Sequence, residues 1–469
     1  MSDATAALES APANQYTKLN VPRKVGYAVG DFACNMSWSL VSNYLVFFMT
    51  DIALIPAGLV SAVMLISKAW DAINDPIIGT LADHTRSKLG RYRPWILFSS
   101  IPMLLCNVAT FTTFSNWGLT GRAWWAFGTY FVLVLLYTMV NVTYSAMPAV
   151  LTRDTDTRTS LASYRMTAAF LAMTLLSYFL LRVVNWAGGG AHGYQTAAMI
   201  FSALACPFFF IVFASTKEIV DVKPEHSNFS TSLKAIVHNN PMWHIVIAYL
   251  GWGVVQGGFT VKMYYCTYNI GDQMLYANAS TLQSVVGMIG TFSVTFLVKK
   301  VKNKGTLAGI GAALVALGSI VCYFTPAATF GGPMFMAMAV PIGFGMGMML
   351  ASIFGMEPDC AEYTQYYEHG VYIPGFISTI INFALKFGQA IAISAATAVM
   401  AALGYVANLA QTPVVLSGIN FMSHMFVFLV MVIVAIAMFT YKLDKEKYAW
   451  LCERISKGES AAQGEKPIC

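Results

Sequence analysis

The sequence predicts an all-α polytopic membrane protein with twelve transmembrane helices in two six-helix bundles. Hydrophobic residues make up 57% of its 469 residues, charged residues only 11%, and apolar stretches of about 20 residues recur along the chain. Globular domains carry about 25% charged residues, whereas about 20 apolar residues span the hydrocarbon core of a bilayer. These proportions exclude a soluble enzyme, a disordered scaffold and a nucleic-acid-binding protein.

The apolar stretches give twelve expected spans. They lie at residues 26–50, 54–81, 95–115, 123–149, 161–184, 194–215, 242–269, 278–298, 306–326, 331–356, 373–403 and 417–441. Gly388 interrupts the eleventh span and is a candidate site for a kink. Residues 1–25 are polar and lack the apolar core of a secretory signal peptide, so we expect them to form a cytoplasmic tail.

A long hydrophilic connection at residues 216–241 divides the chain into an N-terminal bundle, residues 26–215, and a C-terminal bundle, residues 242–441. A second tail follows at residues 442–469. The loops after the second and eighth spans are both basic, which suggests that one six-helix unit has been duplicated. Secondary transporters use this arrangement to bind a substrate at the midplane between the two repeats.

The distribution of Lys and Arg predicts the orientation. Segments on the side of the N-terminus hold 22 of the 28 basic residues, and the opposite loops hold only Arg122. Since cytoplasmic loops retain positive charge, we expect both termini to be cytoplasmic. The net charge of +6 thus reflects topology rather than a nucleic-acid partner.

The sequence shows no sign of an enzyme or of a cofactor site. Its eight cysteines lie far apart without a CxxC pair, so neither a disulfide framework nor a zinc site is indicated. HExxH and GxSxG motifs are absent from the sequence, and no cluster of histidines occurs within a span.

The second span carries the most ionisable residues at bilayer depth. Lys68, Asp71 and Asp75 are three and four residues apart and share a helical face, with Asn74 beside them. A charge there costs about 2.5–3.5 kcal/mol on insertion scales, so such groups face a cavity or each other. Two carboxylates, an amide oxygen and a hydroxyl from another helix suit a small cation such as sodium. Alternatively, Lys68 and Asp71 merely neutralise each other while Asp75 braces a helix end.

The fourth span offers a complementary polar wall. Thr138, Asn141 and Ser145 lie at offsets of three and seven residues, and Tyr137 lies beside them. Hydroxyl groups in membrane helices often bond their own backbone, so packing is the alternative interpretation of this stripe.

Three further spans carry isolated charges. Asp31, with Asn35 one turn later, needs a cationic partner, and Arg165 and Lys386 are the candidates. Lys386 shares a helical face with Asn382, which suits the hydroxyls or the carboxylate of a ligand. The alternative for Lys386 is structural pairing with an acidic residue.

Charged residues at the expected cytoplasmic mouth suggest a latch between the halves. The loop after the second span holds one acid among several cations, namely Asp83, Arg86, Arg91 and Arg93. Asp359 and Glu362 lie in an expected loop after the tenth span. We expect these opposite charges to pair in one transport state and separate in the other. A solvated basic loop that serves only topology is the alternative.

Several motifs together resemble the glycoside, pentoside and hexuronide cation symporters, the family of the melibiose carrier. They are GYAVGD at 26–31, WDAINDP at 70–76, TRSKLGRYRPW at 85–95, Tyr137-Thr138 with Asn141, and Lys386-Phe387-Gly388. The resemblance implies the major facilitator superfamily fold, alternating access and a bacterial inner membrane location. It also implies a co-transported sodium ion or proton, no bound cofactor, and a sugar or glycoside substrate. We expect a monomer whose other partners are the cation and the bilayer.

Carried over residue by residue, the resemblance implies a cation site and a sugar site. The cation site would comprise Asp71, Asn74, Asp75 and Thr138. The sugar site would include Tyr137, Arg165 and Lys386.

The chain departs from the melibiose carrier at three positions of the implied sugar site. Asn35 and Asn141 replace acidic residues that grip galactoside hydroxyls, and Ser145 replaces a tryptophan. Removing two negative charges from a low-dielectric cavity makes it more tolerant of an anion. We therefore expect a hexuronide or glucuronide-type glycoside. Neutral galactosides, pentosides or xylosides are the alternative substrates, and a membrane sensor that has lost transport is the alternative class.

Overall fold

The computed structural model describes residues 19–152, 155–218, 234, 236–237, 239–368 and 373–461, and every regular element among them is helical. The chain divides into two compact units. The N-terminal unit comprises residues 1–224 and 404–410, and the C-terminal unit comprises residues 225–403 and 411–469.

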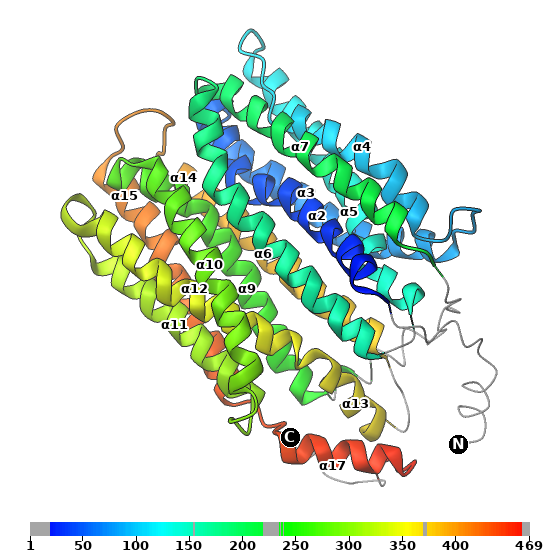
Figure 1. Cartoon of the computed structure of the whole chain (residues 1–469). Coiled ribbons are helices and arrows are strands. Elements are labelled where there is room, and N and C mark those ends of the chain that lie inside the picture. Colours follow the sequence, from blue (N-terminus) through cyan, green and yellow to red (C-terminus); the bar gives the residue numbers. More distant parts are fainter. Residues whose placement is uncertain are drawn as a thin grey trace. The chain divides into compact units, whose positions relative to one another are not determined.

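The N-terminal unit is built from six long helices, which lie side by side in Figure 1 (blue to green). They are α2 (Val21–Phe47), α3 (Ala57–His84), α4 (Arg93–Thr110), α5 (Leu119–Leu151), α6 (Thr155–Trp186) and α7 (Gly190–Ser215). A π-helical turn, η2 (Phe48–Ile52), extends α2. Helix α2 packs against both α6 and α7, and α5 packs against α3 and α4. This packing brings polar residues of α2, α3, α5 and α6 into the interior of the unit.

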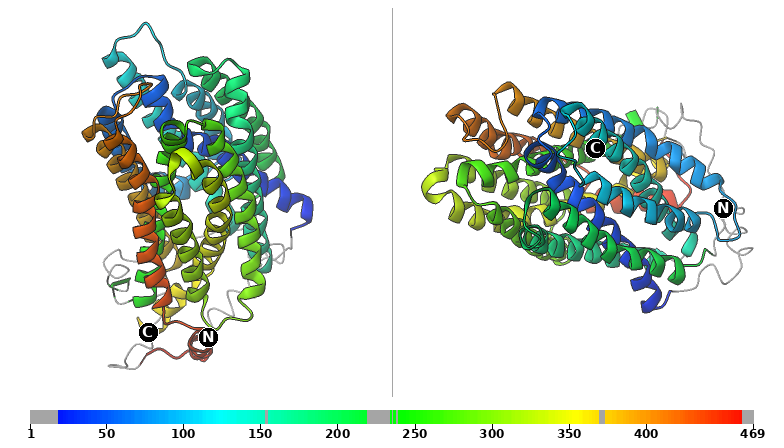
Figure 2. Two further views of the ribbon diagram at one scale, coloured as in Figure 1. Left: turned by 90° about the vertical axis from the view of Figure 1, so that its left-hand side faces the viewer. Right: turned by 90° about the horizontal axis from the view of Figure 1, so that it is seen from above.

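The C-terminal unit has the same general construction. Its helices are α9 (Asn240–Tyr264), α10 (Gln273–Leu297), α11 (Lys304–Phe324), α12 (Gly332–Phe354), α13 (Glu357–Tyr367), α14 (Pro374–Ala402), α15 (Pro413–Asn420), α16 (Phe426–Phe439) and α17 (Lys445–Ser456). Short π-helical segments η3 (Tyr265–Ile270), η4 (Ala327–Gly331) and η5 (Phe421–Met425) join or extend them. The long helices run beside one another in both views of Figure 2 (green to red). Helix α17 packs on α13 at one end of this bundle.

Sequence signals explain where these helices begin. The side chain of Asn20 accepts a hydrogen bond from the first turn of α2, and Pro22 stands within that turn. Asp272 caps α10 and Asn303 caps α11 in the same way. Side-chain acceptors bind backbone amide groups that have no partner within the helix. Proline is tolerated in the first turn because it has no amide proton that would need a partner there.

Within the described residues, nine helical segments are long and apolar enough to cross a membrane. Helices α2, α3 and α4 are not among the nine. Helices α2 and α3 contain the buried ionisable residues Asp31, Lys68 and Asp71, which lower their hydropathy. In these two helices, residues that the sequence marks as functional candidates therefore lower the hydropathy.

Two local expectations differ from the structure. Helix α14 is continuous, and Gly388 lies against α9, where an added Cβ would be 2.4 Å from the carbonyl oxygen of Leu250. The glycine thus permits close helix packing rather than a break. The expected loop around Asp359 and Glu362 is instead α13, because a proline and acidic residues in the first turn favour a helix start.

Residues 404–410, between α14 and α15, pack with the N-terminal unit. Tyr405 donates its hydroxyl proton to the buried carboxylate of Asp51, with 2.7 Å to either oxygen. The side-chain amide of Asn408 donates to the backbone carbonyl of Asp51 at 2.6 Å. Asp51, at the end of the extension of α2, therefore has neutral hydrogen-bond donors.

Candidate functional site: a polar cluster in the N-terminal bundle

The two carboxylates of α3 meet the hydroxyl of Thr138 on α5. Thr138 Oγ1 lies 3.4 Å from an Asp71 oxygen and 3.2 Å from an Asp75 oxygen. Asp71, Asn74 and Thr138 are almost fully buried, and the Asn74 side-chain nitrogen has no hydrogen-bond partner. The spacing along α3 placed both carboxylates on one face, and packing against α5 supplies the hydroxyl. This set of oxygen atoms can bind a small monovalent cation.

Lys68 connects this cluster to an aromatic stack. Its ammonium nitrogen lies 3.9 Å from an Asp71 oxygen and 4.9 Å from the centre of the Trp38 ring. Trp38 stacks on Tyr137, with 4.1 Å between the ring centres and 17° between the planes. Lys68 thus offsets part of the negative charge of the cluster.

A second charged pair joins α2 to α6. Arg165 Nε donates to an Asp31 oxygen at 2.5 Å, and a second nitrogen of the guanidinium lies 3.4 Å from the other oxygen. The structure therefore provides the cationic partner that Asp31 requires, and it is Arg165. Such a two-point contact is stronger and more directional than a single charged hydrogen bond.

Two tyrosines hold Arg165 in place. Its guanidinium lies 4.8 Å from the Tyr144 ring centre and 5.9 Å from that of Tyr27. The two rings stack, and each hydroxyl donates to the backbone carbonyl of the other residue. The role of Tyr27 was not visible in the sequence, because an aromatic residue in a span is most often ordinary packing.

The polar residues that flank this pair differ in their hydrogen-bond partners and in their exposure. The side-chain amide of Asn35 donates to the backbone carbonyl of Asp31 at 2.9 Å. Ser145 is exposed and its hydroxyl lies 3.4 Å from an Arg165 nitrogen. Asn141 is half-buried one turn beyond Tyr137 on α5. Ser145 thus extends the Asp31–Arg165 pair, whereas Asn35 uses at least one donor within its own helix.

The C-terminal residues of the expected site lie on α14. Lys386 is half-buried, and Asn382 is exposed and donates to the carbonyl of Ser378. One turn away, Gln389 donates to Gln256 of α9 at 2.6 Å. Gln256 had no distinguishing sequence signal, since a lone amide in an apolar helix forms no spacing pattern.

The expected latch residues have local partners in their own units. Asp359 accepts from Lys304 Nζ at 2.7 and 3.0 Å, and Glu362 accepts from the Cys452 thiol of α17 at 3.4 Å. Arg93 donates to the backbone carbonyl of Phe213, and Arg86 is exposed. The side chain of Asp83 lies outside the part that the structure describes.

A residue absent from the expected latch organises the loop after α3. Glu218 accepts hydrogen bonds from the backbone amides of Arg91, Tyr92 and Arg93 at 2.6 to 3.1 Å. The carboxylate therefore caps the start of α4, where amide groups lack helical partners and the helix dipole favours negative charge. The role of Arg91 in this contact comes from its backbone.

The described residues contain no group of three or more His, Cys, Asp or Glu side chains that could hold a metal ion. The cluster of α3 and α5 has two acidic members, the Thr138 hydroxyl between them, and Asn74 as a buried neighbour on α3. Such a ligand set fits a transported monovalent cation better than a resident divalent metal.

Comparisons with known proteins show the family of the chain. The family described as MFS/sugar transport protein matches residues 26–445. The isoprimeverose transporter of Lactiplantibacillus pentosus is 32% identical over 453 residues, which cover 92% of this chain and 91% of the relative. A glucuronide carrier protein homolog of Escherichia coli K12 is 26% identical over 84% of this chain and 87% of its own.

The fold also matches that of solved transporters. A D-xylose-proton symporter superposes with a TM-score of 0.63 over 90% of this chain and 97% of its own, at 14% sequence identity. At that identity the likeness shows only the fold, which is that of the major facilitator superfamily. The chain therefore belongs to the MFS sugar transport family, in the group of glycoside, pentoside and hexuronide cation symporters, and is a multi-pass membrane protein that transports a sugar or glycoside with a cation.

Proposed function

We propose that Asp71, Asn74, Asp75 and Thr138 bind the co-transported cation. The observation that carries this proposal is the convergence of both carboxylates on the Thr138 hydroxyl at 3.2 and 3.4 Å. With Lys68 beside Asp71, the cluster carries one net negative charge that a monovalent cation cancels. Either a sodium ion or a proton on one carboxylate satisfies this requirement.

The glycoside binds beside the Asp31–Arg165 pair, with Tyr137, Asn141 and Ser145 on α5 lining the same region. Thr138 and Tyr137 are adjacent in the chain, so a cation that fixes Thr138 also restricts the position of the Tyr137 ring. The cation thereby favours the state that binds sugar, because a ligand shifts an equilibrium only by its differential affinity for the two states.

A neutral glycoside is the substrate class that the charges support best. Arg165 is already neutralised by Asp31 through two contacts, and Lys68 is paired with Asp71. The N-terminal wall of the site is then uncharged once a cation is bound. A charged pair of this kind offers both donors and acceptors to sugar hydroxyls. The likeness to an isoprimeverose transporter agrees with this proposal.

A hexuronide is the second candidate. Asn35 and Asn141 supply no negative charge to repel a carboxylate, and Lys386 supplies a cation on α14. The likeness to a glucuronide carrier homolog agrees with this alternative. Binding would require the carboxylate either to pair with Lys386 or to displace Asp31 from Arg165.

Uptake into proteoliposomes separates these possibilities. Labelled xyloside, galactoside and glucuronide substrates are each supplied under an inward sodium or proton gradient. If one gradient stimulates the uptake of one substrate and Asp75→Asn abolishes this stimulation, the result supports the cation site and identifies the ion. Cation-stimulated uptake that survives Asp75→Asn unchanged contradicts the site. Uptake of the glucuronide alone contradicts the neutral substrate.

We further propose that both termini face the cytoplasm of a bacterial cell, as the distribution of basic residues predicts. A single cysteine placed at Ser456, in a chain without other cysteines, tests this orientation. An impermeant maleimide should label it in inverted vesicles and not in intact cells. Labelling in intact cells would contradict this orientation and place the C-terminal segment outside the cell.

The latch expected for Asp359 and Glu362 stays a prediction, and in the structure Asp359 pairs with Lys304 of its own unit. Replacing Asp359 with Lys should slow transport while leaving the affinity for the glycoside intact.

A further inference from the structure

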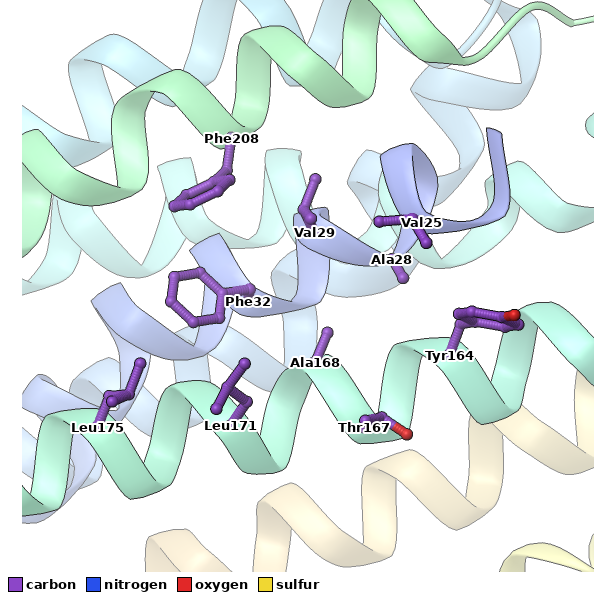
Figure 3. Close-up of a pocket in the computed structure, with 10 residues that line it drawn as sticks. All are labelled: Val25, Ala28, Val29, Phe32, Tyr164, Thr167, Ala168, Leu171, Leu175 and Phe208. Carbon is purple, nitrogen blue, oxygen red and sulfur yellow. The ribbon is translucent and has the colours of Figure 1, made fainter. Parts of the chain in front are cut away.

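An apolar groove runs along the outside of the N-terminal unit, between α6 and α7 and above α2 (Figure 3). Its volume is about 550 Å³, within the range of about 300–1,000 Å³ that is usual for binding sites of small molecules. Helix α2 contributes its floor, α6 one wall, and Phe208 of α7 the other. Its principal lining residues are Val25, Phe32, Tyr164, Leu171, Leu175 and Phe208.

The dimensions of the groove match one leaflet of a bilayer. Its wall on α6 extends from Tyr164 to Leu175, about 16 Å at about 1.5 Å per residue. The hydrocarbon of one leaflet is about 15 Å thick, half of the core. Val25 and Leu171 are 44% and 49% exposed, so the groove is open along its length.

One basic side chain, that of Lys24, is placed at the end of the groove where α2 begins, and Arg23 and Lys217 lie close to this end in the sequence. Lys24 donates its ammonium proton to Ser160 of α6 at 3.0 Å, one helical turn before Tyr164. Arg23, beside it, is exposed. On the other side, an added Cβ on Gly26 would lie 2.5 Å from the side chain of Ser215, so the end of α7 adjoins α2 there. Exposed Lys217 follows two residues later.

The residues at this end of the groove are of the types that are usual where a membrane protein meets the lipid headgroups. Figure 3 shows the Tyr164 ring at the Val25 end, with the deeper positions occupied by Phe32, Leu171 and Leu175. Tyrosine is enriched where hydrocarbon meets the headgroups, and Lys and Arg direct their charges toward that layer. The groove therefore has an apolar body and a cationic mouth.

The geometry points to a binding site for an anionic phospholipid in this groove. One acyl chain lies between α6 and α7 against Val29 and Phe32, and the headgroup phosphate lies at Arg23, Lys24 and Lys217. The charge at the mouth selects an anionic headgroup, because basic residues near the membrane surface attract anionic lipids. Because α2 and α6 also carry Asp31 and Arg165, the lipid packs against the two helices that hold this ion pair.

A second apolar groove lies in the C-terminal unit. It has a volume of about 480 Å³ and is lined by residues of α11 and the segment that follows, including Ile320, Phe324 and Phe330. None of its lining residues is charged. The first groove is lined by uncharged residues as well, so filling the second groove is a control for the apolar body of the first.

Native mass spectrometry of the purified full chain tests the proposal with phosphatidylglycerol and phosphatidylcholine as probes. We expect the wild-type chain to keep at least one phosphatidylglycerol molecule bound under delipidating conditions that remove phosphatidylcholine. The triple variant Arg23→Gln, Lys24→Gln and Lys217→Gln should lose this preference. Ala168→Trp, which fills the groove, should lose the bound lipid, whereas Ile320→Trp in the control groove should retain it.

Inorganic phosphate, which has the charge but no acyl chain, should not displace the lipid. Thermal unfolding of each variant separates loss of the site from loss of the fold, and Arg23→Lys with Lys24→Arg should keep the lipid. Equal retention of phosphatidylglycerol by the triple variant and the wild type contradicts the cationic mouth. Retention by Ala168→Trp contradicts the groove itself, and neither result bears on the assignment of the cation site.

Discussion

Thr138 is the residue that brings two acidic side chains of one helix into a single site. Asp71 and Asp75 repel each other unless a cation or a proton lies between them, and the hydroxyl supplies an oxygen from a second helix. Its contribution is therefore separable from that of the carboxylates.

Replacing Thr138 with Val removes this oxygen and keeps the shape of the side chain. We expect the apparent affinity for the cation to fall about tenfold, equivalent to ~1.4 kcal/mol. The cation dependence of glycoside uptake in proteoliposomes measures this change.

Thr143→Val is the matched control for Thr138→Val. Thr143 is also buried on α5, but its hydroxyl donates to the Met139 carbonyl of the same helix. Its loss should leave the cation dependence unchanged. Equal effects of the two substitutions would show that Thr138 acts through helix packing alone.

The Asp31–Arg165 pair allows a test of charge balance at a single position. Asp31→Asn leaves the guanidinium without its counter-charge in a mostly buried setting, for which losses of about 3–5 kcal/mol are typical. We expect a clear fall in the thermal unfolding midpoint in detergent. The double variant Asp31→Asn with Arg165→Gln should recover part of this loss, because no lone charge remains. A double variant less stable than the single one would contradict this account.

At the scale of elements, glycines determine how closely α9 and α14 approach. An added Cβ on Gly253 would lie 2.1 Å from the Leu385 carbonyl oxygen and 2.9 Å from the Gln389 amide nitrogen. These are backbone atoms, so the helices themselves would have to separate. The same contact surface carries the Gln256–Gln389 hydrogen bond and positions Lys386.

Gly253→Ala should therefore lower the unfolding midpoint by several degrees and weaken glycoside binding, because α14 moves with its polar face. Gly128 in α5 is the matched control, since a Cβ added there would have no heavy atom within 4 Å. Gly128→Ala should be neutral or stabilising by up to about 1 kcal/mol, the helix propensity difference. Unfolding followed by intrinsic fluorescence compares the two variants, and a stable Gly253→Ala chain would contradict close packing.

Most of the long helices were predictable because apolar length is a property of each segment alone, although α2, α3 and α4 are not among the nine helical segments that are long and apolar enough to cross a membrane. So was the shared face of Asp71 and Asp75, which follows from helical periodicity. Arg165 could be named as a candidate for Asp31, but the choice of partner depends on the packing of α2 against α6. The start of α13 was also readable from Pro358 and its acidic first turn, although the charges there suggested a loop. The Glu218 cap could not be read, because it joins segments about 125 residues apart.

At the scale of the whole molecule, cation and glycoside sites are two ligands of one conformational equilibrium. Helix α5 carries Thr138 beside Tyr137, and Asn141 and Ser145 follow on the same helix. Linkage requires that the factor by which the cation raises glycoside affinity equals the factor by which the glycoside raises cation affinity.

We expect this coupling factor to lie between about 5 and 150, the usual range for linked sites. Calorimetric titration of the glycoside with and without the cation, and of the cation with and without the glycoside, measures it from both directions. Asp75→Asn should bring the factor to one while the glycoside still binds, because the carboxylate contacts Thr138 of the cation cluster. A factor of one in the wild-type chain for sodium, lithium and protons alike would mean that the Asp71–Thr138–Asp75 cluster is structural. Transport would then have to draw its driving force from another pair of residues.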